Sequence, residues 1–282
     1  MRLVRYGNPG KEKPGLIDSE GNLRDLSHIV SDIHADVLSR TGRARLQALA
    51  HETLPLVDAQ QVRYGVPVAH VGQLIGIGLN YSDHAKESNM PIPSEPVIFI
   101  KAIGCLNGPN DPLVKPAVSL KMDWEVELGI VIGETTKNVS VNDALDYIAG
   151  YCVVHDVSER HFQLERGGTW DKGKGFDTFG PVGPWLVTPD EVHDVQNLEL
   201  WLEVNGERMQ HGNTSTMIFS CAELVSYTSQ VMTLRPGDII TTGTPPGVGM
   251  GRTPARFLAV GDQVRLGIQG LGIQEQRVIA EA

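Results

Sequence analysis

Positive charge, long apolar runs and cysteines are all scarce in this chain. Its 282 residues carry a net charge of −10, which excludes the basic surface that nucleic-acid binding requires. No stretch approaches the roughly 18 consecutive apolar residues of a membrane span. The opening segment MRLVRYGNPGKEKPG has no apolar core of a secretory signal, so we expect a cytoplasmic protein. Cys105, Cys152 and Cys221 are scattered without CxxC spacing, which predicts reduced thiols and excludes a disulfide framework or a zinc site.

Glycine, by contrast, is abundant, and its placement predicts the fold class. Many of the 31 glycines stand between short runs of β-branched residues, a pattern typical of turn-rich sheet proteins. We therefore expect an α+β fold dominated by sheet. Hydrophobic residues make up 41% of the chain and charged residues 21%, which is ordinary for a protein with a buried core.

The pattern of apolar segments divides the chain into two expected domains. Residues 1–68 read as a small α+β domain with two short strands, a helical patch at 35–50 and a connector at 55–70. Residues 69–282 form the larger, catalytic domain, where apolar runs alternate with Gly/Pro turns. Helices are expected there at about 81–89, 142–148, 158–164 and 220–232.

Two glycine-rich segments resemble nucleotide-binding motifs but lack an essential residue of each. GGTWDKGKG places Lys174 at phosphate-loop spacing, but Gly175 stands where a Ser or Thr should bind Mg²⁺. GIGLNY has Tyr81 where a dinucleotide fingerprint requires its third glycine. Neither segment predicts nucleotide binding.

The segment LKMDWEVELGIVIG carries three acids at alternate positions, Asp123, Glu125 and Glu127. In a strand these side chains share one face, while the apolar side chains between them occupy the other. One interpretation is the solvated face of an edge strand. The other is a site for Mg²⁺ or Mn²⁺, cations that prefer carboxylate oxygens, with a third ligand from elsewhere.

Asp156 is the best candidate for that third ligand, because it stands where the apolar run of YCVVHDVSERHFQ ends. Asp156 could equally cap a helix, with Glu159 completing a capping box. Arg160 and Gln163 follow at helical spacing, and an Arg there could bind a substrate carboxylate with two hydrogen bonds. Both interpretations of Asp156 stay open at this point.

Three further side chains could take part in chemistry. In NYSDHAKES, His84 and Glu87 are three residues apart, so the carboxylate could orient an imidazole that activates water, or the two could merely touch on an exposed helix. Lys174 is flanked by glycines that let a ligand approach, although a flexible surface loop would look the same. Lys101 ends an apolar strand, where it could face a pocket or extend towards solvent.

In this order and at this spacing, the segments resemble the fumarylacetoacetate hydrolase family. The matching pieces, which span about residues 70–282, are GLNYSDHAKE, EPVIFIKA, DWEVELGIVIG, HDVSERHFQ, KGKGFDTFGPVGPW, VNGERMQHGNTSTMIF and GDIITTGTPPGVG. The whole chain looks like longer bacterial members, which include 2,4-diketo-3-deoxy sugar-acid hydrolases and proteins labelled ureidoglycolate lyase. The resemblance implies a mixed β-sandwich roll, a homodimer, and Mg²⁺ or Mn²⁺ held by Glu125, Glu127 and Asp156.

The resemblance also implies a role for each remaining candidate. His84 and Glu87 become the pair that activates water, on a segment that closes over ligand, and Lys174 faces the oxo group of the substrate. The expected substrate contacts are Arg160, Gln163, Lys101 and Thr244. Asp123 matches no family role. Segment 76–82 lacks the additional acidic ligand of the tyrosine-catabolic member, so three carboxylates with water and substrate oxygens should complete the coordination.

The expected activity is Mg²⁺-dependent hydrolysis of a C–C bond in a 2,4-dioxo acid, which yields pyruvate and a carboxylic acid. A lyase, isomerase or decarboxylase with the same metal site is the alternative. A metal-dependent binding protein without catalysis is a third possibility, and the complete His84–Glu87 and carboxylate set argues against it. The acyl group of the substrate and the role of the N-terminal domain do not follow from the sequence.

Overall fold

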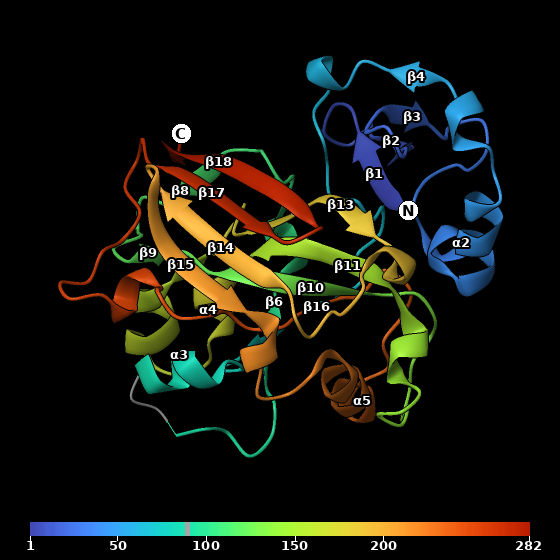
Figure 1. Cartoon of the computed structure of the whole chain (residues 1–282). Helices are drawn as coiled ribbons and strands as arrows, with labels where there is room; N and C mark the ends of the chain where they lie inside the picture. Colours follow the sequence, from blue (N-terminus) through green and yellow to red (C-terminus); the bar gives the residue numbers. More distant parts are fainter. Residues whose placement is uncertain (88–90) are drawn as a thin grey trace.

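The computed structural model describes residues 1–87 and 91–282, and its two main sheets are packed face to face. The large mixed sheet has the strand order β4-β3-β2-β1-β13-β11-β10-β16-β5-β6, and β7 pairs with β13 beside it. The second sheet has the order β15-β14-β17-β18-β8, and a two-stranded ladder joins β12 to β9. Strands β14, β17 and β18 lie across β10 and β11 (Figure 1). The fold is therefore sheet-rich α+β, as the sequence predicts.

The strands of the large sheet are β1 (Arg2–Tyr6), β2 (Lys13–Ile17), β3 (Leu23–Asp25), β4 (Leu56–Val57), β5 (Leu74–Gly78), β6 (Val97–Lys101), β7 (Leu106–Asn107), β10 (Val126–Ile132), β11 (Ile148–His155), β13 (Gly180–Val187) and β16 (Ile239–Thr241). The other strands are β8 (Leu113–Lys115), β9 (Met122–Asp123), β12 (Ser158–Glu159), β14 (Glu199–Val204), β15 (Glu207–Asn213), β17 (Gln263–Ile268) and β18 (Gly272–Ala280). The α-helices are α1 (Ala35–Leu38), α2 (Arg40–Gln47), α3 (Ser82–Glu87), α4 (Asp171–Lys174) and α5 (Cys221–Val231).

Helices at 35–50, 81–89 and 220–232 are found as α1 and α2, α3, and α5, although residues 88 and 89 lie outside the described part of the chain. The two other helix predictions were inaccurate. Only a single 3₁₀ turn, Ala144–Tyr147, precedes β11, and the segment 158–164 opens with strand β12 before a π-helical turn at His161–Glu165. In the segment 158–164 the polar residues make tertiary contacts, and these contacts override helix propensity.

The acidic segment 120–133 forms two strands with an interruption, where the sequence predicts one. Met122–Asp123 pairs with β12, the chain leaves the ladder at Trp124 and Glu125, and β10 begins at Val126 between β11 and β16. Every residue of β10 is buried, and strands β14 and β17 of the second sheet pack against it. The edge-strand interpretation of the three acids is therefore wrong.

The N-terminal segment forms a separate lobe in Figure 1 that is nevertheless joined to the large sheet. Strand β1 pairs with β13, with Arg2 opposite Val187 and Leu3 opposite Leu186. One face of β1 and β2 packs into the main core, and the other covers a small cluster of Val4, Tyr6, Ile17 and Leu23. The predicted connector also contributes β4 and so belongs to this lobe.

Candidate active site

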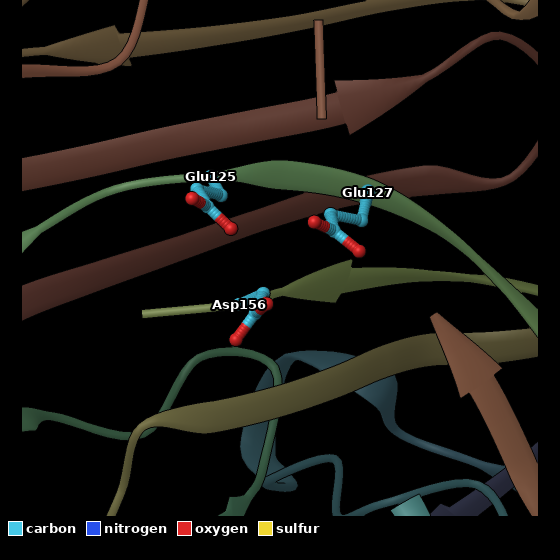
Figure 2. A group of neighbouring side chains, drawn as sticks. All are labelled: Glu125, Glu127 and Asp156. Atoms are coloured by element: carbon cyan, nitrogen blue, oxygen red, sulfur yellow. The ribbon is translucent and has the colours of Figure 1, made fainter. Parts of the chain in front are cut away.

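Strand register brings the three predicted carboxylates together. Val126 of β10 lies opposite His155 of β11, and the Asp156 N–H donates to the Glu125 carbonyl at 3.0 Å, so Glu125 and Asp156 meet at the strand ends. Figure 2 shows these two side chains and that of Glu127 as close neighbours. One oxygen from each of the three lies within 4.8 Å of the other two. Their residues are 5%, 2% and 0% exposed for Glu125, Glu127 and Asp156, respectively.

Glu127 keeps one oxygen free for a ligand. Its Oε2 accepts from the Thr241 hydroxyl and from the Gly243 N–H at 2.9 Å, while its Oε1 accepts no hydrogen bond from the described residues. Burial raises the pKa of Glu127 well above its ordinary value, and the negative charges of Asp156 and Glu125 raise it further. A cation among the three carboxylates would remove this repulsion. The donor set, three carboxylates in an inward-facing group, suits Mg²⁺ or Mn²⁺.

Lys174 supplies positive charge to the other two carboxylates. Its ammonium lies 2.6 Å from Glu125 Oε2 and 2.6 Å from Asp156 Oδ2. Burial acts to lower the pKa of Lys174, but these carboxylates outweigh it and the net shift is upward, so the side chain is charged. For Glu125, burial acts to raise the pKa, whereas Lys174 and Arg160 lower it below its ordinary range.

Lys101 lies behind Asp156 and does not line the cavity. Its side chain is 0% exposed, and its ammonium donates to Asp156 Oδ1 at 2.6 Å, to the Val157 carbonyl at 3.3 Å and to the Lys174 carbonyl at 2.5 Å. All three donors of the ammonium are thereby used. The structure therefore gives no support to the expected contact of Lys101 with substrate; Lys101 orients Asp156 instead. The Asp156 carboxylate caps no helix in the described part of the chain, so the capping interpretation of Asp156 is wrong.

Asp123 holds two parts of the site together. Its Oδ2 accepts from Arg160 Nε at 2.8 Å and from the Met250 N–H at 3.0 Å, and its Oδ1 accepts from the N–H groups of Gly249 and Trp124 at 2.6 and 2.8 Å. The residue is 0% exposed, so these four bonds offset the cost of burying its charge. Asp123, which the sequence left without a role, thus orients Arg160 and fixes the loop after β16.

Arg160 and Gln163 lie side by side on the cavity wall, as the spacing predicts. Arg160 Nη1 donates to Gln163 Oε1 at 3.0 Å, and Arg160 Nη2 lies 2.6 Å from Glu125 Oε1. Glu159, proposed to complete a capping box, instead accepts from the N–H groups of Phe162, Leu120 and Lys121. The π-helical turn, and not an α-helix from residue 158, positions Gln163.

His84 and Glu87 form a hydrogen-bonded pair at one end of α3. The distance from His84 Nδ1 to Glu87 Oε2 is 2.9 Å, and Glu87 Oε1 accepts from the Gly247 N–H at 2.9 Å. Asp83 bonds Thr216 and so ties the helix to the chain after β15. Because Glu87 is held on both oxygens, it fixes the orientation of the imidazole and leaves Nε2 to act on a ligand.

These groups line one cavity of about 450 Å³. Its lining includes every predicted catalytic residue and two of the three metal candidates, together with Arg160, Gln163 and Thr244. Asp156 lies just beneath this surface. Thr244 lines the cavity, but its hydroxyl donates to the Val126 carbonyl at 2.9 Å and accepts from Gln210 at 2.8 Å. The Thr244 hydroxyl hydrogen is therefore not available to a substrate carboxylate in this structure.

An aromatic wall faces the charged groups, and sequence reasoning missed it. The rings of Phe99 and Trp170 are 5.7 Å apart, and the Lys174 ammonium lies 5.0 Å from the centre of the Phe99 ring. Gly76 and Gly78 make room for them, because an added Cβ would lie 2.1 Å from Phe99 and 2.3 Å from Trp170. The segment GIGLNY could have indicated this wall, because its glycines stand at alternate positions and so share one face of a strand.

The cavity thus combines a buried carboxylate cluster able to bind a divalent cation, an oriented imidazole and a buried ammonium. Fold and site together indicate an enzyme. Comparison with known proteins narrows this class. The family model described as fumarylacetoacetate (FAA) hydrolase C-terminal matches residues 73–279.

A protein of Burkholderia lata, provisionally named a hydrolase, is 61% identical over 277 residues, which are 98% of each chain. Among solved structures, a maleylpyruvate hydrolase from Sphingobium sp. SYK-6, in complex with manganese(II) ion and pyruvate, is 30% identical, with a TM-score of 0.84 over 100% of both chains. A 2-hydroxyhepta-2,4-diene-1,7-dioate isomerase from Mycobacterium marinum is 35% identical, with a TM-score of 0.81 over 100% of this chain and 99% of that one. The chain belongs to the fumarylacetoacetate hydrolase family.

No helix within residues 1–87 and 91–282 has both the length and the apolar character to span a membrane.

Proposed function

We propose that the protein hydrolyses a C–C bond of a 2,4-dioxo acid, an acylpyruvate or 2,4-diketo-3-deoxy sugar acid, in the presence of Mg²⁺ or Mn²⁺. One observation carries the proposal: the hydrogen-bonded His84–Glu87 pair lines the same cavity as Glu125 and Glu127, and Asp156 completes their carboxylate cluster just beneath it. An isomerase or decarboxylase needs the carboxylate cluster but no group to activate water. The solved maleylpyruvate hydrolase, with manganese and pyruvate bound, supports both the metal and the pyruvate part.

The metal would be held by Glu125, Glu127 and Asp156, and when bound it would supply Lewis-acid stabilisation of the oxygens at the pyruvate end. Lys174 lies beside these carboxylates and places a second positive charge there. The ammonium thus stabilises the negative charge that develops on the pyruvate part as the C–C bond breaks.

His84 acts as general base. Because Nδ1 is bonded to Glu87, Nε2 accepts the proton of a water molecule that attacks the distal carbonyl. Glu87 stabilises the imidazolium that results, and the same imidazolium can return the proton to the pyruvate carbon. Arg160 and Gln163 orient the substrate, and Phe99 and Trp170 exclude bulk water from the reacting atoms.

The test is pyruvate release from a panel of acylpyruvates by purified wild-type protein and His84→Ala. General-base help is worth about 10²–10⁴-fold, so we expect turnover to fall by that factor while Mn²⁺ affinity is retained. Oxaloacetate and ureidoglycolate serve as controls for decarboxylase and lyase activity. Near-normal hydrolysis by His84→Ala would contradict the assigned role.

An isomerase is the second candidate, favoured by the solved dienedioate isomerase that shares the whole fold. It predicts that turnover of a dienoic diacid survives the loss of His84 but not the loss of Glu125. We also propose a homodimer, and residues 1–68 as a domain attached through the β1–β13 pairing. Sedimentation of the purified chain tests the first of these proposals.

A further inference from the structure

The loop after β16 places one cation of the cavity wall apart from the others. Residues 250–253 line the cavity on the side of the His84–Glu87 pair. Two contacts fix this position: the Gly247 N–H donates to Glu87, and a Cβ on Gly251 would lie 3.1 Å from the Glu87 carboxyl carbon. The Arg252 side chain, 35% exposed, therefore lies at the outer end of the cavity, beyond the pair.

Arg252 differs from the other cavity cations in having a weak partner. Arg160 and Lys174 are buried against two carboxylates each. The Arg252 guanidinium has one polar partner in the described part of the chain, Glu207 Oε1, which lies 3.4 Å from Nη2, and the Glu207 side chain is 58% exposed. Exposed pairs of this kind contribute little to stability.

Arg252 can leave this partner at low cost. The other Glu207 oxygen accepts from Arg256 Nη1 at 2.8 Å, so Glu207 keeps a cation when Arg252 turns away. A guanidinium with free donors at the mouth of a cavity is suited to bind a carboxylate through two hydrogen bonds. Pyruvate's own carboxylate belongs at the inner end, near the metal candidates and Lys174.

We propose that Arg252 binds a second anionic group, a carboxylate at the far end of the acyl chain, and so selects dicarboxylic oxo acids. This inference rests on the proposed function, because it assumes that the pyruvate part occupies the inner end. The attacked carbonyl then lies between the two anchors, beside His84. The cavity, at about 450 Å³, has room for a linear diacid of this length.

The experiment compares succinylpyruvate with butanoylpyruvate, which replaces the terminal carboxylate by a methyl group. We expect wild-type protein to prefer succinylpyruvate in kcat/KM, and Arg252→Met to lose about tenfold of that preference, mainly through KM. Arg252→Lys should recover part of it. Arg265→Met, which removes the same charge from a side chain that neither lines the cavity nor contacts Glu207, should keep the preference within about twofold.

Two results would overturn the inference: no preference for succinylpyruvate in wild-type protein, or an unchanged preference in Arg252→Met. If wild-type protein hydrolyses neither compound, the proposed hydrolase activity has failed, and binding decides the separate question. Isothermal titration calorimetry then measures the binding of each compound, in the presence of Mn²⁺, to His84→Gln protein and to the same protein that also carries Arg252→Met. Tighter binding of succinylpyruvate that depends on Arg252 supports the inference, and equal binding of the two compounds refutes it.

Discussion

Replacing Lys101 by methionine tests whether this lysine supports the site from behind or contacts substrate. The change keeps the apolar stem and removes the ammonium, so Asp156 Oδ1 and two carbonyls lose their donor. Breaking a buried ion pair by removing one partner costs about 3–5 kcal/mol. Because Lys174 still pairs with the other Asp156 oxygen, we expect the lower end, about 3 kcal/mol.

In a chain of this size that loss corresponds to a fall of roughly 5 °C in the unfolding temperature. The assay is calorimetric or circular-dichroism unfolding, with Lys172→Met as the matched control, since Lys172 is exposed. Added Mn²⁺ should restore part of the lost stability, because a cation on Asp156 replaces the missing charge. If Lys101→Met unfolds at the same temperature as Lys172→Met and instead has a raised KM for substrate, this reasoning is refuted.

Three further predictions concern other parts of the structure. Gly78→Ala should push Trp170 aside, since its Cβ would lie 2.3 Å from that ring, and we expect it to destabilise the fold by about 1–3 kcal/mol. Gly104→Ala is the control, because a Cβ there has room and should not destabilise the fold. Urea titration compares the free energies of unfolding of the two variants. Glu127→Gln should weaken Mn²⁺ binding by more than about tenfold in calorimetry, and unchanged affinity would exclude Glu127 as a ligand. Burial acts to raise the pKa of Asp18, but hydrogen bonds from Arg24 and from backbone N–H groups outweigh it and lower this pKa to about 2. The ionised Asp18 therefore stabilises the fold above about pH 4, and this stabilisation is lost as the pH falls towards 2. Asp18→Asn should therefore flatten the stability profile across that window, and an unaltered profile would contradict the assignment.

The sequence predicts the chemical groups of the site better than their surroundings. The alternation of Asp123, Glu125 and Glu127 indicates a shared face, and the structure places the last two with Asp156 in one cluster. The alternation could not show whether that face is solvated, because burial depends on which strands lie on either side. Only the position of β10 between β11 and β16 decides it.

Long-range hydrogen bonds explain most of what the sequence could not predict. Asp123 contacts residues 37 and 126 positions away, and Lys101 contacts a carboxylate 55 positions away. No local pattern encodes such partners. Propensity also failed at 158–164, since one Glu159 oxygen bonds the distant backbone of Leu120 and Lys121 and the other bonds only the N–H of Phe162 in the short π-helical turn.

The four hydrogen bonds of Asp123 have a consequence for engineering. This one carboxylate fixes both Arg160 and the backbone at Gly249 and Met250, so the loop beyond it begins from a defined point. Side chains at positions 250, 252 and 253 line the cavity but supply none of the carboxylates of the cluster. A library restricted to these three positions would change one wall of the cavity without altering the carboxylate cluster or the His84–Glu87 pair, so this loop is the place to vary in a search for altered substrate specificity.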